Sequence, residues 1–252
     1  TLLVMKKLCI WLCIISGLSP LSSSWAQEAD GIAVDRLTVE IETGKRPITL
    51  RAGIDLYRPM RGQVDDAFAG FELVGDLSVT DNIYIAMEIG TEDRTIQSEQ
   101  INFTAKGSYI KLGIDYNMFE NWKGMDNLVY IGLRYARSAH ELNVNDYLLF
   151  GTEHFFEDTL TTSGYSTGLR PDLNAQWMEF LAGIKVQLFN NLYMGFSLRL
   201  NVLANQNTPE NFANLYIPGF NKVTDENRFG IGFNYTLSYA LPFRFGKKTT
   251  KP

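Results

Sequence analysis

The chain has 252 residues and is modestly acidic, with 23 basic against 28 acidic residues and a net charge of −5. Apolar residues make up 45% of it and aromatic residues 13%, a composition that excludes a wholly disordered chain. The acidic balance gives no electrostatic reason to bind nucleic acid, so we expect no partner of that class.

Residues 1–26 have the pattern of a cleaved secretory signal peptide. Two lysines precede a short apolar run, and Ser24 and Ala26 are small residues at the two positions that a signal peptidase reads. The alternative, a transmembrane anchor, requires about 20 apolar residues, which this run does not reach. Both cysteines, Cys9 and Cys13, lie within the same segment. The mature protein is therefore expected to be exported and to have no thiol or disulfide.

Eight later segments alternate apolar and polar residues with a period of two. This period is typical of β-strands, because successive side chains of a strand point to opposite faces. In chain order the segments span about residues 48–57, 71–79, 83–90, 109–117, 129–136, 178–188, 192–201 and 229–243. Within residues 192–201, for example, Leu198 and Leu200 lie on one face and Arg199 on the other. The alternation by itself fits a soluble β-sandwich, a lipocalin-like barrel and a membrane barrel alike.

The connections between these segments differ in length. Residues 80–82 and 190–191 are short links with hairpin chemistry, and residues 119–127 form a somewhat longer link. The other connections are long and polar, at about residues 58–70, 91–107, 138–175 and 203–228. Short links at one end, long loops at the other and an even number of strands are typical of an outer-membrane barrel. A compact soluble domain rarely tolerates so many long loops.

The chemistry of the two faces favours the same fold. The apolar face has almost no charge, and Tyr116, Phe180 and Phe243 lie towards strand ends, where a membrane interface is expected. The other face is rich in glycine and carries charges of both signs, which can pair inside a narrow eight-stranded barrel. The predicted lumen charge network consists of Arg51, Asp55, Glu72, Asp76, Glu88, Lys111, Asp115, Arg134, Glu179, Lys185 and Arg199.

We therefore predict an all-β fold: an eight-stranded antiparallel up-and-down transmembrane β-barrel with short periplasmic turns and long extracellular loops. The barrel is expected over residues 47–245, after a periplasmic N-terminal segment at residues 27–46 and before a flexible tail at residues 246–252. The last strand closes on the aromatic Phe243, which is similar to the signal that outer-membrane insertion machinery recognises. That machinery and the lipid of the outer membrane are the expected partners.

Four stretches also resemble a known family. They are ITLRAGIDLYRP, GSYIKLGIDYNMFENW, FNNLYMGFSLRLN and NLYIPGFNKVTDENRFGIGFNYTLSY, and together they are similar to an uncharacterised family of predicted outer-membrane β-barrels from the Bacteroidota. The likeness covers about residues 46–243, and residues 216–226 are its most specific part. It implies the fold class and the location. It implies no activity and no catalytic residue, because none is assigned to the family.

Ser138 and His140 are the residues that favour an enzyme. They stand two apart at a strand end, so they share a face, and Glu141 and Glu153 are nearby in the sequence. Some outer-membrane lipid-A hydrolases use a membrane-facing set of Ser, His and Glu, in which the base lies within hydrogen-bond reach of the hydroxyl. These are common residue types without a nucleophile elbow or a fixed spacing. We therefore expect a solvated loop, no catalytic residue and no enzyme.

The segment EHFFED is the candidate metal site. Glu153, His154, Glu157 and Asp158 have side chains that bind cations, but surface loops are often this acidic without a ligand. We therefore expect no metal and no cofactor.

The segment NLYIPGF is the candidate contact surface. Exposed in the fourth long loop, Tyr216, Ile217 and Phe220 would form an apolar contact for a protein partner or for lipid. The alternative is that the segment folds inward as a cap over the barrel mouth.

The functional prediction is a small outer-membrane barrel with a closed, charge-filled lumen and a structural or surface-interaction role. A narrow channel for small solutes is the first alternative, and a lipid-A-modifying enzyme is the second. Ligand, partner and oligomeric state do not follow from the sequence.

Overall fold

The computed structural model describes residues 48–119, 127–149, 159–161, 167–208, 214–222 and 228–242. The predicted signal peptide, the predicted N-terminal segment, the tail at residues 246–252 and the EHFFED segment lie outside these ranges.

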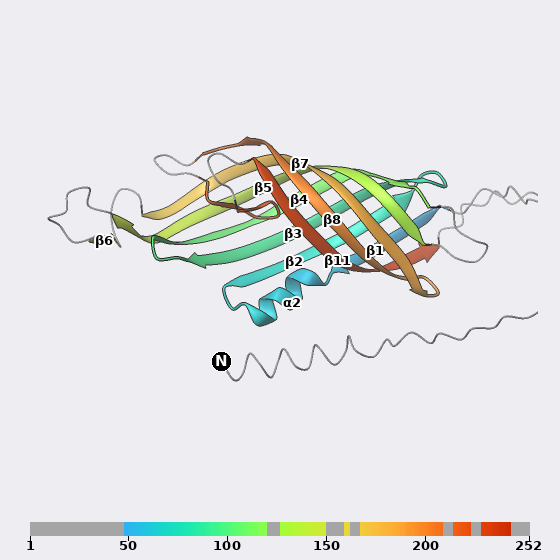
Figure 1. Ribbon diagram of the computed structural model, residues 1–252, viewed down its shortest axis with the longest axis horizontal. Coiled ribbons are helices and arrows are strands. Elements are labelled where there is room, and N and C mark those ends of the chain that lie inside the picture. The colour runs from blue at the N-terminus through green and yellow to red at the C-terminus, as the bar shows by residue number, and fades with distance from the viewer. Residues whose placement is uncertain are drawn as a thin grey trace, which may run out of the picture. The chain divides into compact units, whose positions relative to one another are not determined.

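The described residues form strands and one helix, shown in Figure 1. The elements are β1 (Thr49–Asp55), α2 (Tyr57–Val64), β2 (Phe68–Ser78), β3 (Ile83–Gln97), β4 (Ile101–Asn117), β5 (Leu128–Leu149), β6 (Thr159–Thr161), β7 (Gly168–Phe189), β8 (Leu192–Gln206), β9 (Tyr216–Ile217), β10 (Asn221–Lys222) and β11 (Phe229–Pro242). Within this part of the chain, no helix has the length and the hydropathy needed to cross a bilayer.

Eight of the strands close into a ring. Its order is β1, β2, β3, β4, β5, β7, β8 and β11, with β11 pairing back onto β1, and every pair is antiparallel. The predicted eight-stranded up-and-down barrel is thus confirmed. β6 pairs with the far end of β5, and β9 with β10 forms a small separate hairpin.

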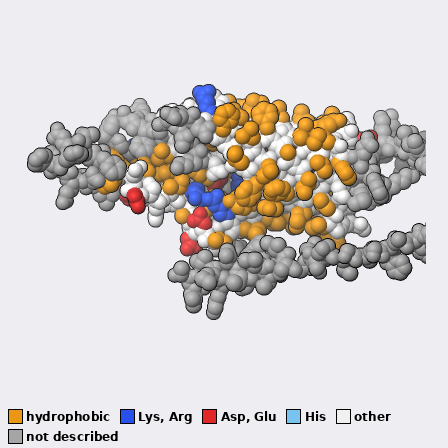
Figure 2. All heavy atoms as spheres, viewed as in Figure 1, with side chains coloured by type: hydrophobic (Ala, Val, Ile, Leu, Met, Phe, Trp, Pro, Cys, Tyr) orange, Lys and Arg blue, Asp and Glu red, His pale blue; other side chains and the backbone are white. Residues whose placement is uncertain are grey.

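The outer surface of the ring is apolar. Leu73, Ile114 and Leu198 are each about half exposed, at 51%, 55% and 55%, and similar side chains cover the barrel surface in Figure 2. Side chains of opposite parity, such as Glu72 and Arg199, are buried. A continuous apolar outer belt around a polar interior is the arrangement of a transmembrane barrel of the outer-membrane type, in which lipid covers the belt.

The strands extend beyond the predicted segments at the end opposite the short turns. β3 and β4 continue through most of residues 91–107 and are joined by residues 98–100 alone. Likewise β5 runs to Leu149 and β7 begins at Gly168, so much of the predicted loop at residues 138–175 is strand. The boundaries predicted for these two loops are therefore wrong.

The reason is that the polarity of the two faces reverses in this part of the barrel, while the inward and outward alternation of side chains stays the same. Phe103, Ala105, Leu142 and Val144 point inward and are buried in one apolar cluster, while Lys106, which follows Ala105, points outward and is exposed. Where water instead of lipid surrounds the barrel, an apolar interior and a polar exterior are favourable. A strand segment whose outward-facing residues are polar therefore resembles a polar loop in the sequence.

Candidate functional site

The interior of the membrane-spanning part is filled by charged side chains. The structure places all eleven residues of the predicted lumen charge network inside the ring, each with less than a tenth of its surface exposed. It adds Arg58 from α2 and Glu92 from β3, which makes six buried cations and seven buried anions among the described residues. The near balance of signs is what an interior without bulk water requires.

Glu88 is the centre of this network. Its carboxylate accepts hydrogen bonds from two nitrogens of Arg199, at 2.6 Å and 3.0 Å, and lies 3.5 Å from Arg134 Nε and 3.8 Å from Lys111 Nζ. Glu179 bridges two of the same cations, with Lys111 Nζ at 2.9 Å and Arg199 Nη1 at 3.0 Å. Bidentate, charge-assisted contacts of this kind hold side chains in one arrangement.

Two further groups lie nearer the short turns. Asp76 accepts from Arg51 Nε at 2.6 Å and from Lys185 Nζ. Asp115 forms a two-point contact with Arg134, whose Nη1 and Nη2 lie 2.7 Å and 2.9 Å from the two carboxylate oxygens. Arg51 also stacks on the rings of Tyr84 and Tyr193, at 4.7 Å and 5.2 Å from their centres.

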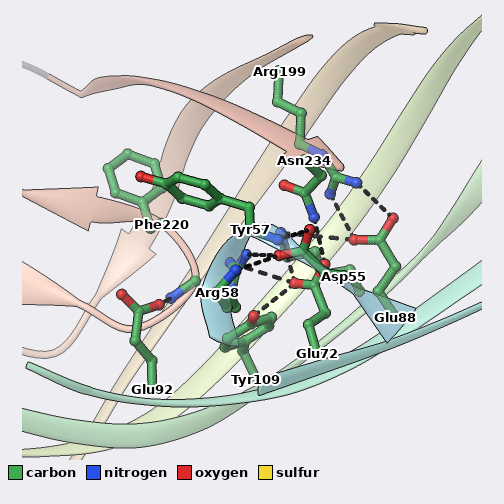
Figure 3. A network of polar contacts seen from close by, with 12 residues as sticks. Asp55, Tyr57, Arg58, Glu72, Glu88, Glu92, Tyr109, Arg199, Phe220 and Asn234 are labelled. Carbon is green, nitrogen blue, oxygen red and sulfur yellow. Dashed lines mark hydrogen bonds and ion pairs between the residues drawn. The ribbon is translucent and has the colours of Figure 1, made fainter. Parts of the chain in front are cut away.

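Arg58 of α2 extends the network beyond the end of β1, and Figure 3 shows it beside Asp55 and Glu72. Its guanidinium contacts Asp55 at 3.1 Å and Glu72 at 3.4 Å. Glu72 also accepts hydrogen bonds from the Tyr109 hydroxyl and the Asn234 amide, both at 2.6 Å. Because Asp55 accepts the backbone N–H of Arg58 as well, at 3.3 Å, the end of β1 and the start of α2 are held by one carboxylate.

Above these charges the segment with β9 and β10 folds into the barrel. Tyr216, Ile217 and Phe220 are buried, with 2%, 0% and 1% of their surface exposed. The prediction of an exposed loop contact is therefore wrong for these three side chains, and the alternative, an inward cap, is what the structure has. In the part of the barrel that water surrounds, burying these apolar side chains inside is lower in free energy than leaving them exposed to water. We call residues 214–222 the cap.

The cap is attached to the barrel by hydrogen bonds and by an aromatic contact. The Tyr216 hydroxyl and the Gly219 N–H, the latter at 3.0 Å, both donate to the Glu92 carboxylate. Burial, together with the negative charge of Glu92, raises the pKa of Tyr216 above its ordinary value. The Phe220 ring packs edge-on against Trp177 of β7, with 5.7 Å between ring centres.

Gly219 is required at the turn of the cap. Its φ of +83° lies in the left-handed region that residues with a side chain rarely adopt. A Cβ at this position would also lie 2.6 Å from an atom of the Tyr109 ring.

The structure does not place Ser138 and His140 on the membrane-facing surface. Both point into the barrel and are buried, at 0% and 5% exposed. His140 Nε2 contacts the amide oxygen of Asn214 in the cap at 3.2 Å, while the Ser138 hydroxyl has no hydrogen-bond partner among the described residues. The parity of β5 decides this, because residues 138 and 140 continue the inward series of Arg134. The membrane-facing arrangement weighed for a lipid-A hydrolase is therefore not formed by these two side chains.

The predicted metal candidates Glu153, His154, Glu157 and Asp158 lie outside the described residues. Within the described ranges, no group of three or more His, Cys, Asp or Glu side chains is arranged to hold a metal ion.

Sequence reasoning missed Arg58 and Glu92. Glu92 continues the inward parity of Glu88, so extending the third strand by four residues would have found it. Arg58 gives no such signal, because it lies on a helix that only the closed barrel brings next to Glu72.

The sequence model of the family described as "Domain of unknown function (DUF6048)" matches residues 4–247. Among curated proteins, none matches the chain. A solved structure with some likeness is the crystal structure of Ail, the attachment invasion locus protein of Yersinia pestis. The two share 10% sequence identity with a TM-score of 0.36, over 79% of this chain and 99% of that chain. A likeness at this level carries no argument about function.

Proposed function

The chain belongs to the family described as Domain of unknown function (DUF6048), and from this premise we propose that it is a closed, non-conducting outer-membrane barrel with a structural or surface-interaction role. The observation that carries the proposal is the blocked interior. Six cations and seven anions fill the membrane-spanning part, and an apolar cap lies above them. The interior of an eight-stranded barrel is just wide enough for side chains to fill it.

The contacts within the network argue against a channel. A solute passing through would have to displace Arg199 from Glu88 and Glu179, which it contacts at 2.6 Å and 3.0 Å. Separating such a pair away from water costs several kcal/mol. It would also have to move the cap, which Tyr216 and Gly219 attach to Glu92.

The same proposal includes a non-enzymatic role and export through a cleaved signal peptide. Support for the first is the inward direction of Ser138 and His140, which removes the membrane-facing pair that favoured lipid-A modification. Support for the second is the pattern of residues 1–26. The partners are the lipid of the outer membrane, the insertion machinery during assembly and a protein partner at the extracellular end.

The test uses the full-length protein purified from outer membranes in detergent. Its gel mobility before and after boiling reports whether it is a closed barrel, and only material that shifts on boiling is then reconstituted into planar bilayers. We expect no conductance steps at any applied voltage, with a porin added to the same bilayer as the positive control. Discrete steps from the shifting material would contradict the closed-lumen proposal and favour the narrow channel.

A further inference from the structure

The wall of the barrel has a gap between β2 and β11. β1 ends at Asp55, which lies opposite Thr236 of β11. Beyond that point residues 229–235 of β11 pair with β8, and residues 68–72 of β2 pair with β3, with no described strand between the two. We call this gap the seam. Because a bilayer does not tolerate an uncovered strand edge, the part of the seam that lies within the apolar belt must be covered by something other than a strand.

Helix α2 lies at the seam and covers part of it. The Tyr57 ring packs against Phe233 of β11, with 4.5 Å between ring centres. On the other side, the Arg61 guanidinium lies over the Phe68 ring of β2 at 4.3 Å. A cavity of about 90 Å³ remains between α2, β11 and the cap. On this measure one water needs about 10–15 Å³, so the cavity has room for a small polar group.

Among the charged residues that line the cavity, cations outnumber anions. Arg58, Arg61, Lys111 and Arg199 contribute to its wall, against one carboxylate, Glu92. Glu92 is already engaged by the Tyr216 hydroxyl and by the cap backbone. Arg58 is 8% exposed, and within the described part of the chain its Nε has no hydrogen-bond partner, although both terminal nitrogens are paired. Figure 2 shows basic and acidic side chains gathered near α2, next to the apolar surface.

An apolar path leads to the cavity from the lipid side. A shallow groove on the outer surface is lined by apolar side chains of β4, β5, β7 and β8 and ends at Ile231 of β11. Ile231, 76% exposed, lines the cavity as well as the groove. The next residue, Gly232, also lines the cavity, and a Cβ built on it meets no atom within 4 Å. A cationic cavity with an apolar approach matches a molecule that has one anionic group and an acyl chain.

We propose that the seam binds an anionic lipid from the outer leaflet, with its oxyanion headgroup in the cavity beside Arg58 and Arg61 and an acyl chain along the groove that ends at Ile231. Guanidinium groups bind phosphate and carboxylate oxygens through charge-assisted hydrogen bonds. The lipid also covers the part of the β11 edge that α2 leaves open. This proposal goes beyond the closed lumen, although Lys111 and Arg199 of the lumen network contribute to the wall of the cavity.

Native mass spectrometry of the full-length barrel in a non-ionic detergent tests the proposal. Dioleoyl phosphatidic acid, dioleoyl phosphatidylcholine and inorganic phosphate are titrated separately. We expect one phosphatidic acid per barrel, bound about tenfold or more tightly than either other probe, because it alone supplies both a small anionic headgroup and an acyl chain. Equal affinity for phosphatidylcholine would overturn the anionic site. Inorganic phosphate binding as tightly as the lipid would replace it with a site for a free anion.

Matched leucine substitutions locate the site without breaking any ion pair. Gly232→Leu fills the cavity and is expected to weaken phosphatidic acid binding about tenfold. Gly75→Leu adds the same side chain at a strand position of β2 where the nearest atom is 3.5 Å from the new Cβ, and it should leave binding unchanged. Equal binding by both variants would overturn the location, provided that both shift on boiling.

A charge variant covers the case in which Gly232→Leu does not fold. Arg61 is partly exposed, and its nearest carboxylate, that of Asp65, is 3.9 Å away, so Arg61→Gln leaves the lumen network intact. We expect this variant to weaken binding of phosphatidic acid about threefold or more, with no effect on phosphatidylcholine. Unchanged selectivity would count against the headgroup position.

Discussion

The two halves of this barrel have opposite interiors, although β3, β4, β5 and β7 run through both. On β4, Lys111 points inward and Leu112 outward in the membrane-spanning half, whereas Ala105 points inward and Lys106 outward in the extracellular half. The backbone alternation is the same, so the surrounding solvent decides which side chains occupy each face. Lipid requires an apolar exterior and leaves the interior to paired charges, while water allows an ordinary apolar core.

Trp177 lies at the boundary of the two halves and belongs to both. Its indole N–H donates to Glu179 of the ion-pair network at 2.7 Å, and its ring packs against Phe220 of the cap. An aromatic residue with one polar atom suits such a position. At this boundary the ion-pair network and the apolar interior are therefore in direct contact through one side chain.

The largest effect is expected from removing the centre of the charged half. Glu88→Ala leaves Arg199, Lys111 and Arg134 facing one another without their shared carboxylate, and should lower the free energy of unfolding by about 4 kcal/mol. Urea unfolding of the protein in lipid vesicles, followed by tryptophan fluorescence, measures this. Met87→Ala, on the lipid-facing side of the same strand, is the control. A loss in the control as large as that in Glu88→Ala would mean that the charges do not set the stability of this half.

A somewhat smaller effect is expected in the apolar half. Leu142 is fully buried in the cluster with Phe103 and Val144, and Leu142→Ala should cost about 3 kcal/mol through the cavity that it creates. The outward-facing neighbour offers the matched control, because Asn143→Ala should change stability by about 0.5 kcal/mol or less. Proteolysis from the extracellular side reports the same difference locally. If both variants are equally resistant, the upper interior is not a core.

The next largest loss of stability is expected when the attachment of the cap is weakened. Tyr216→Phe removes the hydroxyl that donates to Glu92 and should destabilise the cap by about 2 kcal/mol, because a buried carboxylate loses a partner. Hydrogen exchange of the Gly219 amide should become faster, while amides in the membrane-spanning strands stay protected. Unchanged exchange at Gly219 would show that the Tyr216 hydroxyl does not hold the cap in place.

The cap is also expected to loosen at high pH. The pKa of Tyr216 is raised in the folded protein, so the fold favours the protonated hydroxyl. The stability that this contributes is fully present below the ordinary tyrosine pKa of about 10 and is lost as the pH rises through the folded value. Exchange of the Gly219 amide, corrected for its intrinsic pH dependence, should rise above about pH 10 in the wild type. The Tyr216→Phe variant, which lacks this group, should show no such additional rise.

The smallest effect is expected when a charged pair is exchanged as a unit. Asp115 and Arg134 contact each other at two points, and the double change Asp115→Leu with Arg134→Met should alter the free energy of unfolding by about 1 kcal/mol or less. Arg134→Met alone leaves Asp115 without its cation and should cost more than the double, whereas Asp115→Leu alone leaves Arg134 Nε at 3.5 Å from Glu88. A double variant as unstable as the sum of the singles would show that this half needs its charges for more than filling space.

Much of the fold could be predicted from the sequence, because a period of two is local. The parity of Glu88 and Arg199 follows from their neighbours, and so do the strand count and the short turns. The ends of β3, β4, β5 and β7 could not be predicted in the same way, because the polarity that marks each face reverses where the barrel leaves the membrane. The placement of the cap could not be predicted for a similar reason, since the apolar composition of NLYIPGF fits an exposed contact surface and a buried segment equally well.

By itself the sequence determined which side chains share a face and that the charges on one face nearly balance, since both follow from alternation along a single strand. Only the tertiary structure decided which charges meet. Glu88 and Arg199 are 111 residues apart and come within 2.6 Å because the ring closes. Closure also brings Arg58 of α2 to Glu72 and leaves the seam where β1 is too short to fill the wall. Contacts across a closed ring depend on strand order, register and strand length together, and no single stretch of the chain contains that information.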